Sequence, residues 1–116
     1  MEQFKFHLPT QPFVQIEPFI SELTLNSSPN SSRITKLQKH EPGSKTAGDF
    51  THDYIEEIYI VEGSLTDTNL GKTFEKGCYA YRKPGMRHGP FESKEGCLMF
   101  IEIGRASCRE RVFLSV

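Results

Sequence analysis

The amino-acid sequence predicts an all-β domain, built as a small sandwich or barrel of short strands. Nine glycines and seven prolines punctuate a chain of 116 residues. No apolar pattern of helical period continues for three turns, which disfavours helices of ordinary length. Short runs rich in β-branched and aromatic residues recur instead, and segments rich in turn-forming residues separate them. Closely spaced strands of this kind are typical of sandwiches and barrels.

The predicted strands follow one another along the chain, each between two turn segments. β-Branched and aromatic residues favour extended backbone. The segments between them, such as NSSPNSS, NLGK and KPGMRHG, hold the Gly, Pro, Asn and Ser residues that turns require. In order, the predicted strands are Phe13–Ile16, Ile20–Leu25, Arg33–Gln38, Ile55–Val61, Leu65–Thr68, Cys78–Tyr81 and Cys97–Ile103.

Three segments are expected. Residues 1–32 form N-terminal strands or an arm, whose phenylalanines cover an open end of the barrel or build a subunit contact. Residues 33–103 form the core. Residues 104–116 are expected to be a non-native tail, because IGRASCRERV, Ile103 to Val112, matches the translation of a common sequencing-adapter read-through. This tail therefore carries no functional prediction.

The composition excludes several classes of protein. Fourteen basic and 15 acidic residues give a net charge of −1, without the basic excess of a nucleic-acid-binding surface. No apolar run approaches the roughly 20 residues of a membrane helix, and no signal peptide is evident, so a cytoplasmic location is expected. The three cysteines form no CxxC pair and indicate no disulfide framework. Cys78 and Cys97 are expected to be small buried apolar residues.

The stretch THDYIEEIYIVEG carries the chemistry. Alternate side chains of a strand share a face. One face reads His52, Tyr54, Glu56, Ile58, Ile60, and the other reads Asp53, Ile55, Glu57, Tyr59, Val61. If Ile58 and Ile60 point into the core, so do His52 and Glu56, and buried ionisable groups need partners. A divalent metal supplies one, whereas Glu57 is expected to face solvent.

A third ligand is expected from the segment KPGMRHG. A turn at Pro84-Gly85 can reverse the chain and bring His88 alongside the earlier strand. Two histidines and one carboxylate with open positions make the facial triad of non-haem iron sites. On spacing alone, a hydrogen-bonded core or surface histidine is the more common role. His40, in the segment KHEPG, is expected to be a solvated surface residue rather than part of the site rim.

These residues resemble the two motifs of a cupin. Glu56-x6-Gly63 and His52-x3-Glu56 fit the first motif, G-x5-H-x-H-x3,4-E-x6-G, while Gly77, Pro84, Gly85 and His88 approximate the second, G-x5-P-x-G-x2-H. The ChrR type of cupin is the most similar. The resemblance implies a cupin double-stranded β-helix, a jelly-roll barrel, in a bacterial protein that commonly dimerises. Phe50 stands where the first motif has its first histidine, so three ligands remain for Fe, Mn, Ni or Zn.

Two functions follow from the resemblance. The first is a metalloenzyme that oxidises or cleaves a small oxygenated organic molecule in the manner of a dioxygenase. The alternative is a non-catalytic cupin with a degenerate metal site, which binds a small ligand or acts as a sensor or regulator. No catalytic residue is assigned. The side chains expected to shape a substrate pocket are Phe50, Tyr54, Met86 and Arg82. Arg82 suits an anionic substrate, although a salt bridge on the strand surface is the more common role for such a residue.

Overall fold

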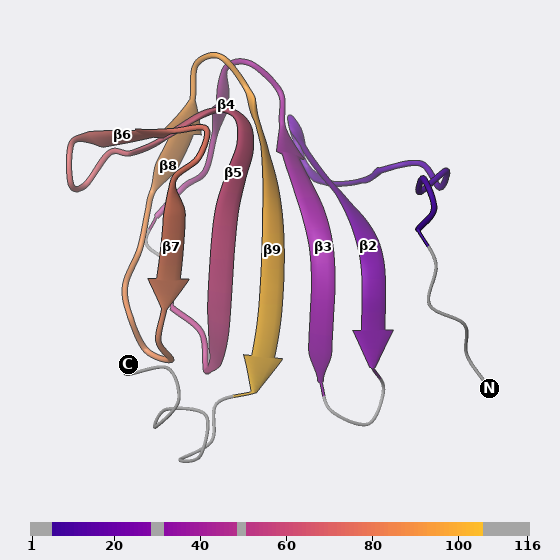
Figure 1. Cartoon of the computed structure of the whole chain (residues 1–116). Helices are drawn as coiled ribbons and strands as arrows, with labels where there is room; N and C mark the ends of the chain where they lie inside the picture. Colours follow the sequence, from indigo (N-terminus) through magenta and orange to yellow (C-terminus); the bar gives the residue numbers. More distant parts are fainter. Residues whose placement is uncertain (1–5, 29–31, 49–50, 106–116) are drawn as a thin grey trace.

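The structure is a computed structural model that describes residues 6–28, 32–48 and 51–105. These residues form nine strands and no helix (Figure 1). The strands are β1 (Val14–Glu17), β2 (Ile20–Ser28), β3 (Arg33–His40), β4 (Ser44–Lys45), β5 (Tyr54–Asp67), β6 (Lys72–Glu75), β7 (Tyr79–Arg82), β8 (Phe91–Ser93) and β9 (Cys97–Arg105). The prediction of an all-β domain is confirmed. In the described part of the chain, no helix is long and apolar enough to cross a membrane.

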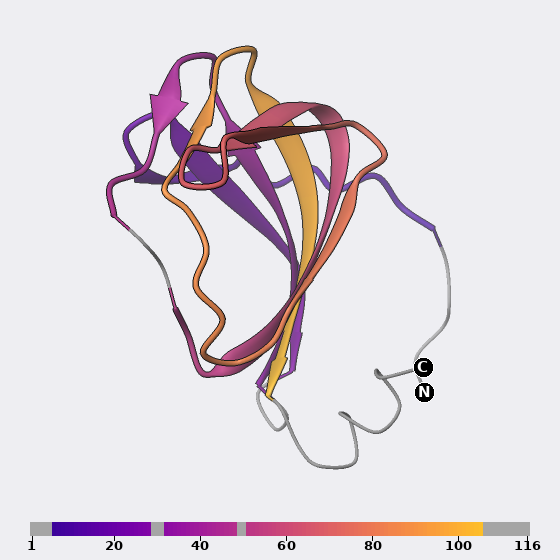
Figure 2. The ribbon, with the colours of Figure 1, turned by 90° about the vertical axis from the view of Figure 1, so that its left-hand side faces the viewer.

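All strand pairs are antiparallel, and the strands join in the order β1-β2-β3-β9-β5-β8-β4. Strands β6 and β7 branch from this path, and both pair with β5. The sheet curls strongly on itself and forms a half-barrel (Figure 2). The last described strand, β9, therefore lies between β3 and β5, far from its neighbours in the sequence.

Strand β5 departs from the prediction of two separate strands. It is one strand of 14 residues that continues through Gly63. Its first half pairs with β7 and β9, and its second half pairs with β6 and β8. The register shifts between Ile60 and Glu62, as a β-bulge does where a sheet bends. Gly63 has φ of 77°, and a Cβ atom there would lie 2.0 Å from the carbonyl oxygen of Gly96, so only glycine fits this bend.

The short strands β4, β6 and β8 were not predicted. Each has two to four residues and too few β-branched or aromatic side chains to be recognised by pattern. Strand β2 extends three residues beyond the predicted Leu25, and β3 extends to His40. Strand β9 continues through Gly104 and Arg105, which pair with Ile55 and Tyr54. The rest of the predicted tail lies outside the described residues.

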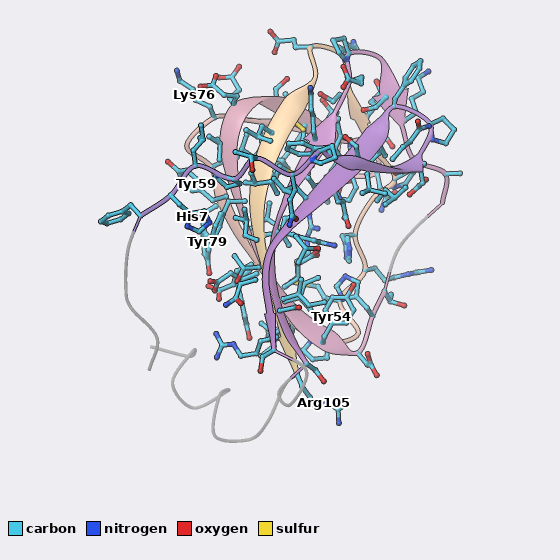
Figure 3. The ribbon with its side chains drawn as sticks, turned by 90° about the vertical axis from the view of Figure 1, so that its right-hand side faces the viewer. His7, Tyr54, Tyr59, Lys76, Tyr79 and Arg105 are labelled. Carbon is cyan, nitrogen blue, oxygen red and sulfur yellow. The ribbon has the colours of Figure 1, made fainter. Side chains whose placement is uncertain are left out.

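The core lies on the concave face of the curled sheet. It is built from Ile58, Ile60, Leu65, Phe91, Cys97, Met99 and Ile101. Alternation holds as predicted at the centre of β5, because Ile58 and Ile60 are buried while Tyr59 between them is 46% exposed; Ile55, which the pattern placed on the face of Tyr59, is also buried. Tyr59 pairs across the sheet with Tyr79, and both rings lie on the outer face (Figure 3). The side chains that precede Ile58 on this face of β5 therefore point into the same concave space as the core.

Candidate metal centre

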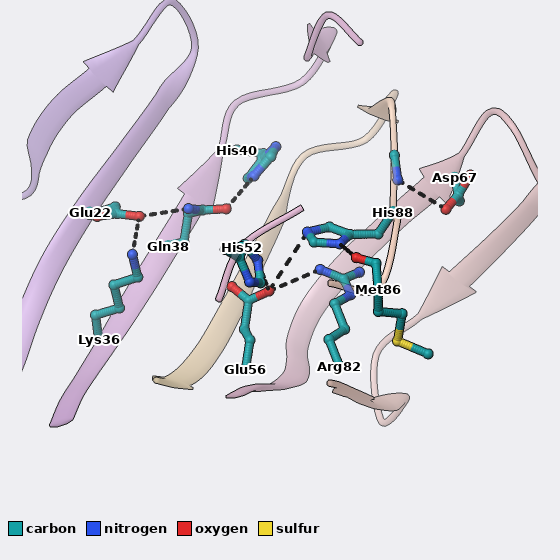
Figure 4. A network of polar contacts seen from close by, with 11 residues as sticks. Glu22, Lys36, Gln38, His40, His52, Glu56, Asp67, Arg82, Met86 and His88 are labelled. Carbon is teal, nitrogen blue, oxygen red and sulfur yellow. Dashed lines mark hydrogen bonds and ion pairs between the residues drawn. The ribbon is translucent and has the colours of Figure 1, made fainter. Parts of the chain in front are cut away.

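Three side chains predicted as metal ligands meet inside the half-barrel. One potential ligand atom from each of His52, Glu56 and His88 lies within 4.8 Å of the other two. The Oε1 atom of Glu56 is 3.4 Å from His52 Nε2 and 3.9 Å from His88 Nε2 (Figure 4). Both distances exceed the usual hydrogen-bond range of about 2.7–3.2 Å. The imidazoles thus face the carboxylate without bonding to it directly.

A turn after β7 brings His88 to the strand. The backbone N–H of Gly85 donates a hydrogen bond of 2.8 Å to the carbonyl of His52, which joins the two segments directly. His88 Nδ1 lies 3.1 Å from the carbonyl oxygen of Met86. Because a carbonyl only accepts, Nδ1 carries the proton and Nε2 keeps its lone pair toward Glu56. Burial, followed by the nearby Arg82 guanidinium, lowers the pKa of His88 below its usual 6.5, and a neutral ring is the form that binds metal.

His52 lacks the partners of an ordinary structural histidine. Its ring stacks on that of Tyr54, with centroids 3.9 Å apart and planes 4° from parallel. Its Nδ1 atom is buried and has no hydrogen-bond partner among the described residues. Buried polar atoms normally have a partner. The long contact between His52 Nε2 and Glu56 fits a site whose remaining member is an ion, whereas the unpartnered Nδ1 points away from that contact.

Glu56 already has one cationic partner. Arg82 Nη1 donates to Glu56 Oε1 over 3.2 Å. The guanidinium carbon of Arg82 lies 5.0 Å from the centre of the Phe91 ring. The Arg82 side chain is 14% exposed, so its salt bridge lies inside the half-barrel rather than on the strand surface. Two imidazoles, a carboxylate and this arginine fit the chemistry of a divalent metal with an anionic co-ligand.

Two hollows adjoin the triad. A cavity of about 170 Å³ lies over the concave face, and residues of the triad, Tyr54 and Arg82 line one side of it. A second hollow of about 230 Å³ is lined mainly by apolar residues, including Leu70, Phe74 and Met86. Arg82, His88 and Phe91 border both. A ligand near the triad therefore meets polar groups in one hollow and apolar groups in the other.

A chain of hydrogen bonds forms the far side of the first cavity. Gln38 Nε2 donates to Glu22 over 2.7 Å, because a carboxylate only accepts. Gln38 Oε1 then accepts from His40 Nε2 at 2.8 Å, and Ser44 donates to His40 Nδ1 over 3.1 Å. Lys36 completes the chain with a salt bridge of 2.8 Å to Glu22. Both ring nitrogens of His40 have a hydrogen-bond partner, so this chain of hydrogen bonds is satisfied within the protein and has a structural role.

The expectation that His40 is a solvated surface residue was wrong. It is 5% exposed and lines the cavity opposite the triad. The signal was present in the sequence, since Lys36, Gln38 and His40 alternate on one strand and share its inward face. The predicted strand ended at Gln38, two residues too early.

The buried His40 predicts that acid destabilises the fold. Burial lowers the pKa of His40, with partial opposition from the charge of Glu22. Between the lowered pKa and the usual 6.5, the unfolded chain therefore binds a proton that the folded chain does not. The contribution of His40 to the free energy of unfolding is fully present above about pH 6.5 and is lost as the pH falls. Urea unfolding between pH 7.5 and 5 should show a steeper decline for wild type than for His40→Gln. Parallel curves would contradict this.

Asp67 is a positioning residue that the sequence did not reveal. It is 5% exposed, and its Oδ1 atom accepts hydrogen bonds from the backbone N–H groups of Asn69 and Leu70 at 3.0 Å. Its Oδ2 atom accepts from the N–H of Gly89 at 3.3 Å. It thus ties the segment that follows His88 to the end of β5. Nothing in local sequence distinguishes this aspartate from one that merely caps a turn.

The remaining predicted pocket residues fall on different sides of the site. Tyr54 lines the first cavity, and burial, followed by the charge of Glu56, raises its pKa above 10.0. Met86 borders the apolar hollow, is 44% exposed, and touches the triad through its backbone carbonyl. Phe50 lies outside the described residues. Glu57 is half-buried and accepts a hydrogen bond of 2.5 Å from the Tyr79 hydroxyl, away from the triad.

Comparison with known proteins places these features among β-barrel proteins of similar shape. An RmlC-like cupin from Ralstonia eutropha has 18% identity and a TM-score of 0.69, covering 81% of this chain and 63% of that one. An RmlC-like cupin from Shewanella frigidimarina has 17% identity and a TM-score of 0.68, covering 95% and 96%. An acetylacetone dioxygenase from Acinetobacter johnsonii has 18% identity and a TM-score of 0.63, covering 94% and 87%.

At these identities the similarities establish the fold alone. This chain spans 63% of the length of the Ralstonia protein. No curated protein matches the sequence. A family model described as the ChrR cupin-like domain matches residues 1–107, which include all nine strands.

Proposed function

The chain belongs to the ChrR cupin-like family, and from that premise we propose that it is a metal-dependent enzyme. The proposed reaction is the dioxygenase-like oxidation or cleavage of a small oxygenated organic molecule, with O₂ as the oxidant. The observation that carries the proposal is the convergence of His52, Glu56 and His88 within 4.8 Å. The named dioxygenase among the structural neighbours supports the reaction class. A bound Fe, Mn, Ni or Zn ion would supply Lewis-acid binding of substrate oxygens and, for iron, reaction with O₂.

The residues of this chain prepare that chemistry in separate ways. The hydrogen bond to the Met86 carbonyl holds His88 as a neutral imidazole whose Nε2 lone pair is available to a metal. Tyr54 fixes the plane of the His52 ring by stacking. Glu56 brings the negative charge that divalent ions prefer in mixed sites. Burial of all three side chains, which are 10–15% exposed, excludes bulk water from the centre.

A second candidate is a binding or sensory domain that works without metal. The salt bridge between Arg82 and Glu56 favours it, because it neutralises the carboxylate in the absence of an ion. The presence of phenylalanine at position 50, where the cupin motif has a histidine, also favours this candidate. The homodimer and the cytoplasmic location stay predictions from the sequence.

Metal analysis separates the two candidates. Protein purified without added metal and without a histidine-rich tag is expected to carry about one redox-active ion per chain. The Fe²⁺-loaded protein is then expected to consume O₂ in the presence of a small diketone, for which acetylacetone is the first compound to assay. Protein that lacks metal but retains a small organic molecule would contradict the enzyme and favour the binding domain.

The paired carboxylates on β5 provide a matched test of the ligand set. Glu56→Gln keeps the size of the side chain and an amide oxygen that can still contact the ion but removes the charge, so metal affinity is expected to fall by at least the about 10–100-fold that loss of a supporting residue costs. Glu57→Gln lies one residue away on the other face and should leave metal affinity unchanged. Its stability should fall by no more than about 1 kcal/mol, because the amide oxygen can still accept the hydrogen bond from Tyr79 but without the charge. Calorimetric titration with Ni²⁺ and thermal unfolding measure both. The reverse pattern would assign the ligand to Glu57.

A further inference from the structure

Arg82 approaches the same carboxylate oxygen as the two imidazoles. Its Nη1 atom is 3.2 Å from Glu56 Oε1, the atom that also faces His52 and His88 (Figure 4). Glu56 and Arg82 are directly paired residues on the adjacent strands β5 and β7. Directly opposed side chains of two antiparallel strands lie close enough to interact. The register of the sheet therefore holds this arginine at the triad.

Arg82 cannot easily leave when another cation binds Glu56. Its guanidinium lies over the Phe91 ring at 5.0 Å, and its side chain is 14% exposed. Stacking on an aromatic ring stabilises a guanidinium that is removed from water. The arginine would stay beside the triad, with N–H donors that the carboxylate no longer satisfies.

The charges around the cavity then leave a positive surplus. If a divalent ion occupies the proposed site, its two positive charges and that of Arg82 face the single carboxylate of Glu56. Lys36, the other cation of the cavity lining, is already paired with Glu22 at 2.8 Å. Glu17 is exposed at the cavity rim on β1. Cations removed from water need an anionic partner, and the described lining is short of two negative charges, or of one if the exposed Glu17 is counted.

Building on the proposed function, we propose that the metal-loaded site takes a small organic anion, namely a 2-oxo or 2-hydroxy carboxylate, with Arg82 binding its carboxylate. The planar guanidinium matches a carboxylate in geometry and charge. The vicinal oxygens of such a molecule suit the open positions of a three-ligand site. The cavity of about 170 Å³ is smaller than the roughly 300–1,000 Å³ of sites for drug-sized ligands, which restricts the anion to few atoms.

Two probes of matched shape test the proposal. Pyruvate and butane-2,3-dione both offer vicinal oxygens, but only pyruvate carries a carboxylate. In calorimetric titrations of the full chain loaded with Ni²⁺, wild type is expected to bind pyruvate at least about tenfold more tightly than the dione, in keeping with a charge-assisted hydrogen bond. Arg82→Gln should lose most of this preference, the remainder coming from attraction of the carboxylate to the ion, while its affinity for the dione stays unchanged.

The metal alone gives a second readout. Arg82 competes with the ion for Glu56 and repels it, so Arg82→Gln is expected to bind Ni²⁺ several-fold more tightly than wild type. Arg82→Lys keeps the charge and should retain part of the preference for pyruvate. Lys39→Gln removes an equal charge from an exposed position of β3 outside this cavity, where Lys39 pairs with Glu41, and should change neither the Ni²⁺ affinity nor the pyruvate preference.

Each failure has a separate meaning. If wild type and Arg82→Gln both bind Ni²⁺ and prefer pyruvate equally, Arg82 is not the anion site, although the metal site stands. If neither binds Ni²⁺, the proposed function fails and this inference fails with it. Should Arg82→Gln not fold, Arg82→Lys provides the test. A preference for pyruvate as strong as that of wild type would then contradict the proposal that the planar guanidinium binds the carboxylate.

Discussion

Replacing His88 with alanine is expected to lower the affinity for a divalent metal by at least about 100-fold, beyond the 10–100-fold effect of losing a supporting residue. The imidazole is one of the three proposed ligands, and the hydrogen bond to Met86 directs its Nε2 lone pair toward Glu56. His52→Ala should have an effect of similar size. Both variants should remain folded, because neither ring belongs to the apolar core. Calorimetry with Ni²⁺ and circular dichroism measure the two properties.

His40→Gln is the matched control. His40 is also buried and lines the same cavity, but it lies across from the triad with both ring nitrogens bonded. Its replacement should leave metal affinity within a few-fold of wild type while reducing stability. Metal content that persists in His88→Ala would remove that residue from the ligand set. Equal loss in His40→Gln would indicate that any change in the cavity disturbs the site.

Gly63→Ala should have the largest effect on stability, about 3–5 kcal/mol, from a left-handed backbone combined with overpacking. Gly63 has φ of 77°, and a methyl group would lie 2.0 Å from the Gly96 carbonyl oxygen and 2.8 Å from the Cα atom of Cys97. Both atoms belong to backbone, so no side chain can rotate to make space. A loss of this size approaches the whole stability of a small domain. Urea unfolding measures it.

Gly71→Ala separates the two causes. Gly71 has φ of 68°, but nothing lies within 4 Å of the position of its missing Cβ. This variant should lose only the conformational cost of about 1–2 kcal/mol. Equal losses at both positions would show that the contact with Gly96 can relax and that backbone conformation alone requires glycine at position 63.

The sequence predicted the strands that have strong local patterns. Alternation in β5 correctly placed Ile58 and Ile60 in the core and Tyr59 outside. It failed at Gly63, because a glycine that ends a strand and a glycine that bends one look alike without the partner strand. The close approach of Gly96 that demands this residue is a contact between segments more than thirty positions apart. Such contacts belong to tertiary structure, which local pattern does not contain.

Part of the candidate site could be predicted from the sequence for the same reason. His52 and Glu56 follow from the period of one strand, and His88 follows from the reversal at Pro84-Gly85, which the bond from Gly85 to the His52 carbonyl makes explicit. The partnership of Arg82 with Glu56 depends on the register between β5 and β7, which the loops between them set. Local pattern therefore identified the three proposed ligands and placed Arg82 near the pocket, but it did not reveal the pairing of Arg82 with Glu56.

The place of β9 in the sheet has a consequence for synthesis. During translation, β3 and β5 emerge from the ribosome long before β9, which pairs with both of them. Until β9 arrives, the nascent chain exposes two unpaired strand edges, and β5 carries the apolar run IYIV next to one of them. Unpaired apolar edges associate with other chains. Pairing across such sequence separations is also slow. We therefore expect this protein to depend on chaperones and low temperature during expression more than its small size suggests.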